Sequence, residues 1–469
     1  MTRLAPALSG RRTAAATGLL LIAGMAVQLA AFWPGIMVWD AIRQYGQALS
    51  GRYDDWHPPA MSWLWRQLMP LGAGPAPMLL LQLLLYWTGF ALLAAAALRR
   101  GQPHTALATG LCAFLPIPFV LVGTVLKDSL MAGALLCAAG LIGMRRQDDR
   151  WLGCAAAALI MAAATLRFNA VAACLPLLVA TLPASWKNRP RRLAASVAAC
   201  FALLALAMPA ANRLLRAEPS GVQLSLVIYD LGGIGRMSDA DAFPPLPLAD
   251  PIAVNRGCYD PVSWDSYSWW VERPCPVGFA MLRSAFAAHG LSPYRWWLAQ
   301  ILVHPFAYVT HRLVHFDRNT HFLVDDDGAL PGLSLRSDPN DWGFRLSPSR
   351  LRDTIGAIAA WSGHVPIGWP IWWIALGLGC LPLLRVLDRE DPARPMMHSA
   401  LLYAFSYLPL SVASEIRYHL WTMTGTAIAV ASVLCALASG APLSRRRLAA
   451  AFLSVTVVTL LCVGARLPS

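Results

Sequence analysis

Long apolar stretches alternate with short basic clusters along most of the chain. Many of these stretches hold about 16 to 20 residues with few charges, close to the length that an α-helix needs to cross a bilayer. Membrane-spanning helices are therefore predicted at roughly residues 13–36, 75–98, 105–125, 129–144, 151–166, 170–186, 193–211, 366–384, 397–413, 419–438 and 448–464. The first stretch is long and lacks a small-residue cleavage site, so we expect a retained helix rather than a removed signal peptide.

The basic clusters set the expected orientation of these helices. They precede the first predicted helix and follow the second, fourth, sixth, eighth and tenth, so they all fall on one side of the membrane. Loops rich in Lys and Arg face the cytoplasm. We therefore expect the N-terminus inside, the C-terminus outside, and residues 32–74 and 212–365 largely on the extracytoplasmic face.

The composition agrees with a membrane protein. Hydrophobic residues make up 57% of the 469 positions and charged residues only 13%, about half the charge of an ordinary soluble domain. The net charge of +13 is scattered between apolar stretches rather than gathered in one patch, which argues against nucleic acid as a partner. The expected fold class is an all-α polytopic membrane protein with about 11 to 13 spans and an amphipathic loop on its outer face.

The spacing of the apolar stretches divides the chain into an N-terminal transmembrane module, a mostly extracytoplasmic region and a C-terminal transmembrane module, at residues 1–211, 212–365 and 366–469. The first module contains the outer loop of residues 32–74. In the middle region, residues 296–316 are amphipathic and interrupted at His304 and Pro305, so they fit either an interfacial or a spanning helix. A spanning helix there would require another nearby, for instance within residues 350–371.

The ten cysteines contain no metal-binding motif. Eight of them lie inside apolar stretches and are expected to be small packing residues. Cys258 and Cys275 instead flank a polar, aromatic loop, and we expect a disulfide between them if the loop lies in an oxidising compartment, with two free thiols as the alternative. The aromatic rings of this loop suit either sugar stacking or simple packing. They belong to Trp264, Tyr267, Trp269 and Trp270.

The first outer loop gathers acidic and aromatic residues directly after the first predicted helix. Asp40, Gln44 and Gln47 are spaced to share one face of a short helix, which Gly51 is suited to end. Further polar residues precede the pair Pro58-Pro59; they are Asp54, Asp55 and His57. Anchoring at the membrane surface explains the aromatic residues of the loop, but it does not require carboxylates at an apolar boundary.

Asp40 lies closest to the apolar boundary and is the candidate general base. Burial there is expected to raise its pKa toward a useful value. Gln44, Asp54, Asp55 and His57 are expected to bind an acceptor, a metal ion or one another. A divalent cation is the one cofactor that these carboxylates suggest, although their spacing is not diagnostic of a metal site.

Three basic residues lie where the topology does not favour them. Lys127, Arg167 and Arg417 each fall in a short outer turn among apolar residues. A charge at such a depth usually faces a cavity or a partner, and both Arg and Lys bind phosphate oxygens. These three residues are therefore candidate ligands of a phosphate or pyrophosphate headgroup. The alternative is that nearby acids, such as Asp128 and Glu415, neutralise them.

Several motifs occur in a familiar order: Asp40 early in the first outer loop, then Trp56-His57-Pro58-Pro59, then Lys127-Asp128-Ser129, and finally Glu415-Ile416-Arg417-Tyr418. Together they resemble the GT-C superfamily of integral membrane glycosyltransferases. The match is closest to its bacterial branch related to protein mannosyltransferases and lipopolysaccharide-modifying sugar transferases. The resemblance covers the first 190 residues and residues 410–419. The family often has an Asp-Glu pair where Asp40 is followed by Ala41, which leaves the second acid's role open to Asp54 or Asp55.

The resemblance implies an inverting glycosyl transfer at the outer face of a bacterial cytoplasmic membrane, serving the modification of lipopolysaccharide or another envelope glycan. The donor would be a sugar on a polyprenyl phosphate, and the acceptor a lipid, a glycan or a protein. An Asp would act as base on the acceptor hydroxyl. Basic residues would hold the departing phosphate. The candidates for this role in the present sequence are Lys127, Arg167, Arg417 and Tyr418.

Two other classes of function are compatible with many spans and embedded charges. A transporter or flippase for a lipid-linked substrate would use the charges as a path, but its site usually lies near the midplane rather than at one face. An O-antigen polymerase or ligase would also have a large outer loop and essential arginines. The early Asp and the His-Pro-Pro element argue against that class.

Overall fold

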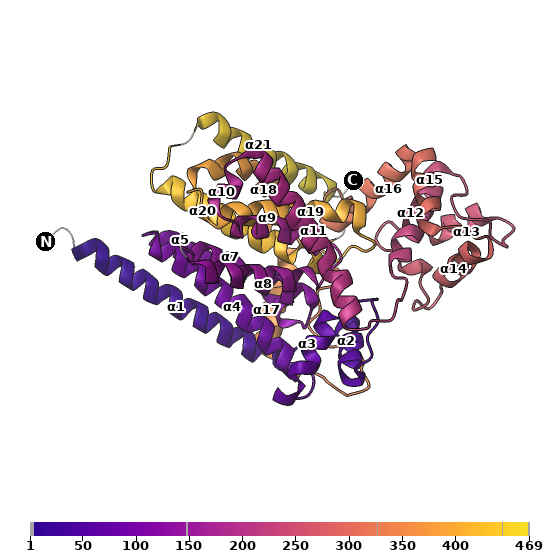
Figure 1. Cartoon of the computed structure of the whole chain (residues 1–469), viewed down its shortest axis with the longest axis horizontal. Helices are drawn as coiled ribbons and strands as arrows, with labels where there is room; N and C mark the ends of the chain where they lie inside the picture. The colour runs from indigo at the N-terminus through magenta and orange to yellow at the C-terminus, as the bar shows by residue number, and fades with distance from the viewer. Residues whose placement is uncertain (1–3, 147–148, 326, 443, 468–469) are drawn as a thin grey trace.

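The computed structural model describes residues 4–146, 149–325, 327–442 and 444–467. These residues form α-helices and short 3-10 turns, with isolated β-bridges but no β-strand among them. A bundle of long helices carries a smaller helical lobe at one end (Figure 1). The expected class of all-α polytopic membrane protein is confirmed.

The bundle contains a helix within each of the eleven predicted ranges. Its N-terminal part consists of α1 (Leu4–Phe32), α4 (Ala76–Arg99), α5 (Pro103–Cys112), α6 (Pro116–Gly123), α7 (Lys127–Met144), α8 (Arg150–Ala164), α9 (Ala170–Thr181), α10 (Ala184–Lys187) and α11 (Pro190–Leu214). Its C-terminal part consists of α18 (Pro370–Cys380), the turn η4 (Leu381–Val386), α19 (Ala393–Leu410), α20 (Leu420–Ala438) and α21 (Arg445–Ala465).

Length and composition single out six segments of the described chain that can cross a membrane, at Gly10–Phe32, Ala76–Arg99, Lys127–Met144, Pro190–Leu214, Ile416–Ala438 and Arg445–Ala465. A seventh is obtained if α5 and α6, bent by 60° at their junction, count as one span. Several other apolar helices are shorter, among them α8, α9 and the α18–η4 segment. The protein is thus polytopic, and the figure of 11 to 13 spans stays a prediction.

A close seam between α4 and α7 forms the centre of the N-terminal part. A Cβ atom on Gly89 would lie 2.4 Å from Cβ of Leu136, and one on Gly140 would lie 2.5 Å from Cβ of Leu92. Small residues at these crossings let two backbones approach, which is how membrane helices gain packing energy without a hydrophobic driving force. Larger side chains at either glycine would force the two helices apart.

The basic clusters meet at one end of the bundle. Arg99 at the end of α4 donates to the carbonyl of Met144 at the end of α7 (3.4 Å), and Arg100 lies 3.5 Å from the carboxylate of Asp391. The side chain of Lys187 donates to the carbonyl of Ala180 at the end of α9 (3.1 Å). Helices α4 and α7 run in the same direction, with their C-terminal ends together, so Lys127 at the start of α7 lies at the other end of the bundle.

The first outer loop and a long irregular segment cover that other end. The loop folds into α2 (Trp39–Ser50), α3 (Ala60–Leu68) and the turn η1 (Met69–Leu71). As predicted, α2 ends at Gly51, which adopts the left-handed conformation and donates its N–H to the carbonyl of Gln47 (2.8 Å). Residues 329–346 run in irregular conformation between the lobe and α17 (Arg350–Ser362), and we call them the strap.

The lobe is built from α12 (Gln223–Ser238), α13 (Pro251–Cys258), the turn η2 (Trp264–Tyr267), α14 (Phe279–Ala288), α15 (Pro293–Val303) and α16 (Pro305–Thr320). It has a hydrophobic core of its own, separate from that of the bundle. The ambiguous stretch 296–316 becomes α15 and α16, which are broken at His304. Neither helix is among the described segments that are long and apolar enough to cross a membrane. In Figure 1, α1 begins at the end of the bundle that lies away from the lobe, and α21 ends at the end of the bundle that is close to the lobe.

Candidate functional site

The carboxylate of Asp40 is shared by two cations that come from distant parts of the chain. Asp40 lies in the first turn of α2, Lys127 is the first residue of α7, and Arg417 lies in the turn η5 (Ile416–His419). Oδ2 of Asp40 accepts hydrogen bonds from Nζ of Lys127 and from Nη1 of Arg417, both at 2.9 Å. The Asp40 side chain keeps 20% of its surface exposed, so the carboxylate can be reached from outside.

His57 completes this cluster from the other side of the outer loop. Its Nδ1 lies 3.0 Å from Nζ of Lys127, and its Nε2 lies 3.5 Å from Oδ1 of Asp40. Because the ammonium group can only donate, Nδ1 must accept, and the proton of the neutral ring then lies on Nε2. Burial and the adjacent Lys127 lower the pKa of His57 to about 3, so the ring is neutral at physiological pH.

The expectation that Asp40 has a raised pKa is wrong in direction. Burial alone would raise the pKa of this carboxyl, but Arg417, Lys127 and His57 together hold it well below its usual range. Asp40 is therefore ionised and paired in this structure. A carboxylate so strongly stabilised becomes a useful base only when some of that positive charge is drawn elsewhere.

Arg167 reaches the same region but pairs with a different acid. Its guanidinium forms an ion pair with Asp128, the neighbour of Lys127 in sequence. The ring of Tyr418 lies between the two arginines, with its centroid 4.7 Å from Cζ of Arg167 and 5.7 Å from Cζ of Arg417. Tyr418 in turn stacks on Tyr407 at 5.3 Å. The three candidate phosphate ligands thus lie at one end of the bundle, as the sequence predicted.

All three cations are neutralised within this end of the bundle. Arg417 pairs with Glu415 as well as with Asp40, and Arg167 pairs with Asp128. The alternative that nearby acids neutralise the cations therefore holds for Arg167, which pairs with Asp128. It holds in part for Arg417, which pairs with both Glu415 and Asp40. It fails for Lys127, which pairs with Asp40 and not with its neighbour Asp128. An anionic ligand must compete with Asp40 for Lys127 and Arg417.

The other polar residues of the outer loop lie apart from this cluster. Asp54 pairs with the exposed Arg43 (2.6 Å), and Asp55 accepts hydrogen bonds from the N–H and the hydroxyl of Ser220, both at 2.6 Å. Gln44 is buried in α2, one turn beyond Asp40, and its Oε1 has no hydrogen-bond partner among the described residues. In the described part of the chain, no three His, Cys, Asp or Glu side chains are grouped to hold a metal ion.

Short stretches of backbone pairing set the position of Asp40. The N–H of Ile36 donates to the carbonyl of Gly123 (3.3 Å), and the carbonyl of Ile36 accepts from the N–H of Val125 (2.9 Å). This bridge fixes residues 36–40 beside residues 123–127, which brings Asp40 next to Lys127. The pairing could not be read from the sequence, because a bridge of this length has no periodic pattern.

The strap holds the start of α2 from the opposite side. The hydroxyl of Ser337 accepts from the N–H of Met37 (3.0 Å), and the N–H of Asp338 donates to the carbonyl of Met37 (2.8 Å). The carboxylate of Asp338 accepts from the N–H of Trp39 at 2.8 Å. Val38, at the N-cap of α2, makes no capping bond of its own, so Asp338 supplies a cap from another part of the chain.

The strap also contacts the segment that carries Arg417. The carbonyl of Pro331 accepts from the N–H of Ile416 (2.8 Å). Gly332 has a φ of +80°, and a Cβ atom there would lie 2.8 Å from the carboxylate of Glu415. Only glycine fits this position without displacing Glu415. Residues 331–338 therefore connect both sides of the ion pair between Asp40 and Arg417.

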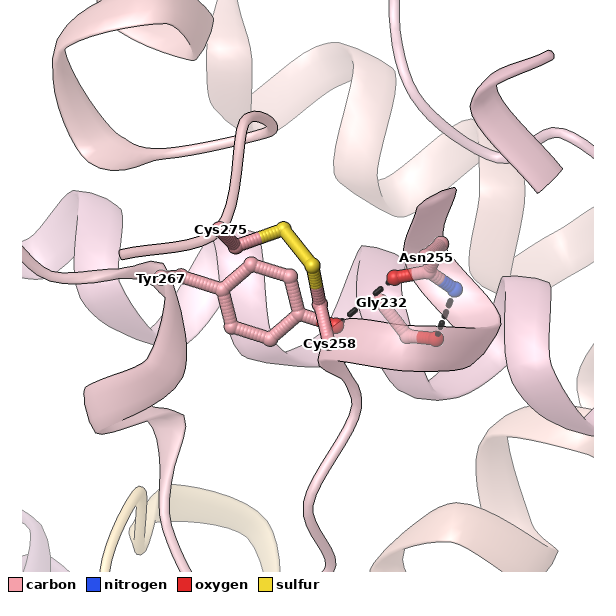
Figure 2. Close-up of a disulfide and its surroundings, with 5 residues drawn as sticks. All are labelled: Gly232, Asn255, Cys258, Tyr267 and Cys275. Atoms are coloured by element: carbon pink, nitrogen blue, oxygen red, sulfur yellow. Dashed lines mark hydrogen bonds between the residues drawn. A yellow bond between two sulfur atoms is a disulfide. The ribbon is translucent and has the colours of Figure 1, made fainter. Parts of the chain in front are cut away.

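The loop between the two lobe cysteines contacts the first outer loop, because Trp264 and Trp269 pack against Trp56. Cys258 and Cys275 are joined by a disulfide, and below it Tyr267 donates to Oδ1 of Asn255 (2.7 Å), whose amide donates to the carbonyl of Gly232 (2.9 Å) (Figure 2). This loop, residues 258–275, is called the disulfide loop below. Its N–H at Trp264 donates to the carbonyl of Val412 (2.9 Å), five residues before Arg417.

Comparison with known proteins identifies a distant structural likeness. No protein-family model matches the sequence, and no curated protein matches it either. Among solved structures, the crystal structure of ArnT from Cupriavidus metallidurans bound to undecaprenyl phosphate is similar to this chain. The similarity covers 90% of this chain and 78% of that chain, at 16% sequence identity and a TM-score of 0.35. The function proposed below rests on this chain's own residues.

Proposed function

We propose that this chain is a membrane glycosyltransferase that moves a sugar from a polyprenyl-phosphate donor to a hydroxyl of a lipid, glycan or protein acceptor. The observation that carries the proposal is the Asp40 carboxylate in contact with both Lys127 and Arg417. A general base and two phosphate-binding cations thus meet at one point. The sequence motifs around these three residues resemble GT-C enzymes, which supports the same assignment.

In the proposed reaction, Lys127 and Arg417 bind the phosphate of the donor, with Arg167 and Tyr418 beside them. The phosphate draws both cations away from Asp40, and the pKa of that carboxyl then rises toward its ordinary range. Asp40 takes the proton of the acceptor hydroxyl as the acceptor oxygen attacks the anomeric carbon. The bond from that carbon to the phosphate oxygen breaks, and its electron pair leaves with the polyprenyl phosphate.

A single displacement of this kind inverts the configuration of the sugar, because the acceptor attacks opposite to the departing phosphate. The cations contribute most to the rate as the bond breaks, since negative charge builds up on the phosphate at that moment. The site lies at the end of the bundle opposite to the basic clusters, so we assign it to the extracytoplasmic face of a bacterial cytoplasmic membrane. A site at one face rather than at the midplane does not favour a transporter.

The test compares the parent with Asp40→Asn after purification in detergent. Each is incubated with polyprenyl-phosphate-linked sugars and an envelope glycan or lipid extract, and the release of polyprenyl phosphate is followed. We expect the variant to lose about 10²- to 10⁴-fold in turnover, the usual contribution of a general base. It should bind the donor at least as well, because Lys127 and Arg417 lose a competing carboxylate.

The matched control is Asp239→Asn, which removes the carboxylate of an exposed ion pair with Arg256 in the lobe. It should release polyprenyl phosphate at the parental rate. Equal release by the parent and a folded Asp40→Asn variant would refute the assignment of the base. No release by the parent, together with movement of a lipid-linked substrate across reconstituted vesicles, would replace the transferase with a transporter.

A further inference from the structure

Two tryptophans of the disulfide loop are exposed outside the candidate spans. Trp269 has 58% of its surface exposed and Trp270 has 47%. Their ring centroids lie 4.9 Å apart. Two large apolar rings side by side on an exposed surface usually mark a binding site, because leaving them in water costs free energy.

The pair belongs to a rigid aromatic surface and not to a loose loop tip. Trp56 of the first outer loop lies 5.1 Å from Trp269 and 5.7 Å from Trp270, measured between ring centroids. Trp264 and Phe279 are buried beneath these rings and contact them. The disulfide closes the loop, so the exposed rings are fixed in advance and little entropy is lost when a ligand binds.

This surface adjoins the reaction centre through two separate connections. Trp56 directly precedes His57, which contacts Lys127. On the other side, the backbone of Trp264 bonds to Val412, and Ser263 forms a β-bridge with Ala413, both close to Glu415 and Arg417. The surface is thus tied to both chain segments that surround the Asp40 carboxylate.

The disulfide loop also brings a carboxylate to the same place. Asp265 lies in η2, partly buried, with no Lys or Arg of the described chain at ion-pairing distance. Burial raises the pKa of Asp265, and the neighbouring carboxylates of Asp260 and Asp40 raise it further. A hydrogen bond with the Ser263 side chain lowers this pKa, and the remaining lone pairs of the carboxyl group can accept a hydrogen bond from a neutral ligand.

We propose that Trp56, Trp269, Trp270 and Asp265 form an acceptor subsite that binds a sugar ring. The C–H face of a pyranose stacks on tryptophan rings, and its hydroxyl groups donate to a carboxylate. Such a ring would lie beside His57, with a hydroxyl within reach of Asp40. This inference rests on the proposed transferase, and it narrows the acceptor from a lipid, glycan or protein to a carbohydrate.

The test measures acceptor kinetics in lipid nanodiscs, which avoid detergents with sugar headgroups. The probe is a water-soluble envelope glycan extract, and two rates are followed: transfer to the extract, and release of polyprenyl phosphate to water without extract. For Trp269→Ala we expect the KM for the extract to rise about threefold to tenfold, the range of one aromatic stacking contact. Hydrolysis of the donor should be unchanged. Trp269→Phe should restore most of the affinity, and Asp265→Ala should raise the KM independently.

Trp186→Ala is the matched control, because Trp186 is 54% exposed but lies beyond α9, at the basic end of the bundle. An unchanged KM in Trp269→Ala would overturn the proposal. The proposal would also be overturned if the extract kept its acceptor activity after periodate oxidation, which destroys sugar rings. Quenching of the fluorescence of these tryptophans by brominated lipids would likewise overturn it, because the rings would then be membrane anchors. A parent that neither transfers nor hydrolyses the donor would instead overturn the transferase itself.

Discussion

A single carboxylate oxygen on Asp40 connects two cations that lie far apart in sequence. Lys127 and Arg417 each donate to Oδ2 at 2.9 Å, and their charges keep the pKa of Asp40 well below its usual range. The neighbouring His57 has a pKa of about 3 and carries no charge near neutral pH. Neither group of the ligand-free protein should therefore titrate between pH 5 and pH 8.

This environment predicts an unusual pH dependence. For the parent, kcat/KM for the donor should show no acidic decline near pH 6.5, because Asp40 stays ionised and His57 stays neutral there. Replacement of Lys127 by Met removes one stabilising charge, so the pKa of Asp40 should rise. The acidic limb of the residual activity should then move to higher pH. An acidic limb near pH 6.5 in the parent would show that a different group controls the reaction.

The residues of the site differ in how well the sequence predicts them. Asp40, Lys127 and Arg417 stand out because a charge beside an apolar stretch is costly and needs a reason. Asp54 and Asp55 carry the same kind of signal, yet their partners Arg43 and Ser220 hold them elsewhere. Local sequence reports the presence of a charge, but its partner depends on tertiary contacts.

At the scale of elements, helices are predictable and extended connections are not. Each predicted span contains a helix, because apolar length is a local property. The strap has neither periodicity nor a strong composition signal, although it sets the geometry of the site. Asp338 and Ser337 act on α2 across about 300 residues of sequence, a relation that no local pattern encodes.

The strap predicts a role for Asp338 as a positioning residue. Asp338→Ala removes the cap from the helix that carries Asp40, at a cost of about 1 kcal/mol in local stability. Amide hydrogen exchange in the first turn of α2 should become faster. The kcat should fall with little change in the KM for the donor, because Lys127 and Arg417 remain in place. Asp338→Asn keeps an acceptor oxygen and should restore most of the activity.

Ser349→Ala provides the control for this experiment. Ser349 caps α17 by accepting from the N–H of Arg352, and that helix carries none of the proposed site residues. Its loss should accelerate exchange in α17 and leave turnover unchanged. If Asp338→Ala and Ser349→Ala behave alike in the activity assay, the strap does not position Asp40.

At the scale of the whole molecule, two separate features distinguish the ends of the bundle. The basic clusters gather at one end of the bundle. The lobe, which holds the disulfide between Cys258 and Cys275, lies at the other end (Figure 1). Basic loops remain in the cytoplasm, whereas disulfides form in oxidising compartments. Both features support the proposed placement of the Asp40 site on the extracytoplasmic side.

This orientation can be tested by labelling single cysteines in intact cells. In a Cys154→Ala background, Arg283→Cys on the exposed surface of α14 should react with a membrane-impermeant maleimide. Arg189→Cys, in the basic connection between α10 and α11, should react only after the membrane is permeabilised. The reverse pattern would place the site in the cytoplasm and remove the basis for a polyprenyl-linked donor on the outer side.

The partners of Asp40 also leave the ribosome at very different times. Lys127 follows Asp40 by 87 residues, whereas Arg417 follows by 377. At roughly 5 to 20 residues per second, the wait for Arg417 is about 20 to 75 seconds. Once Lys127 has been made, it is the only one of these two cations available to Asp40 until Arg417 follows, and the strap is synthesised between them. If translation stops before residue 417, the membrane-inserted part of the chain therefore has Asp40 and Lys127 in place but lacks Arg417.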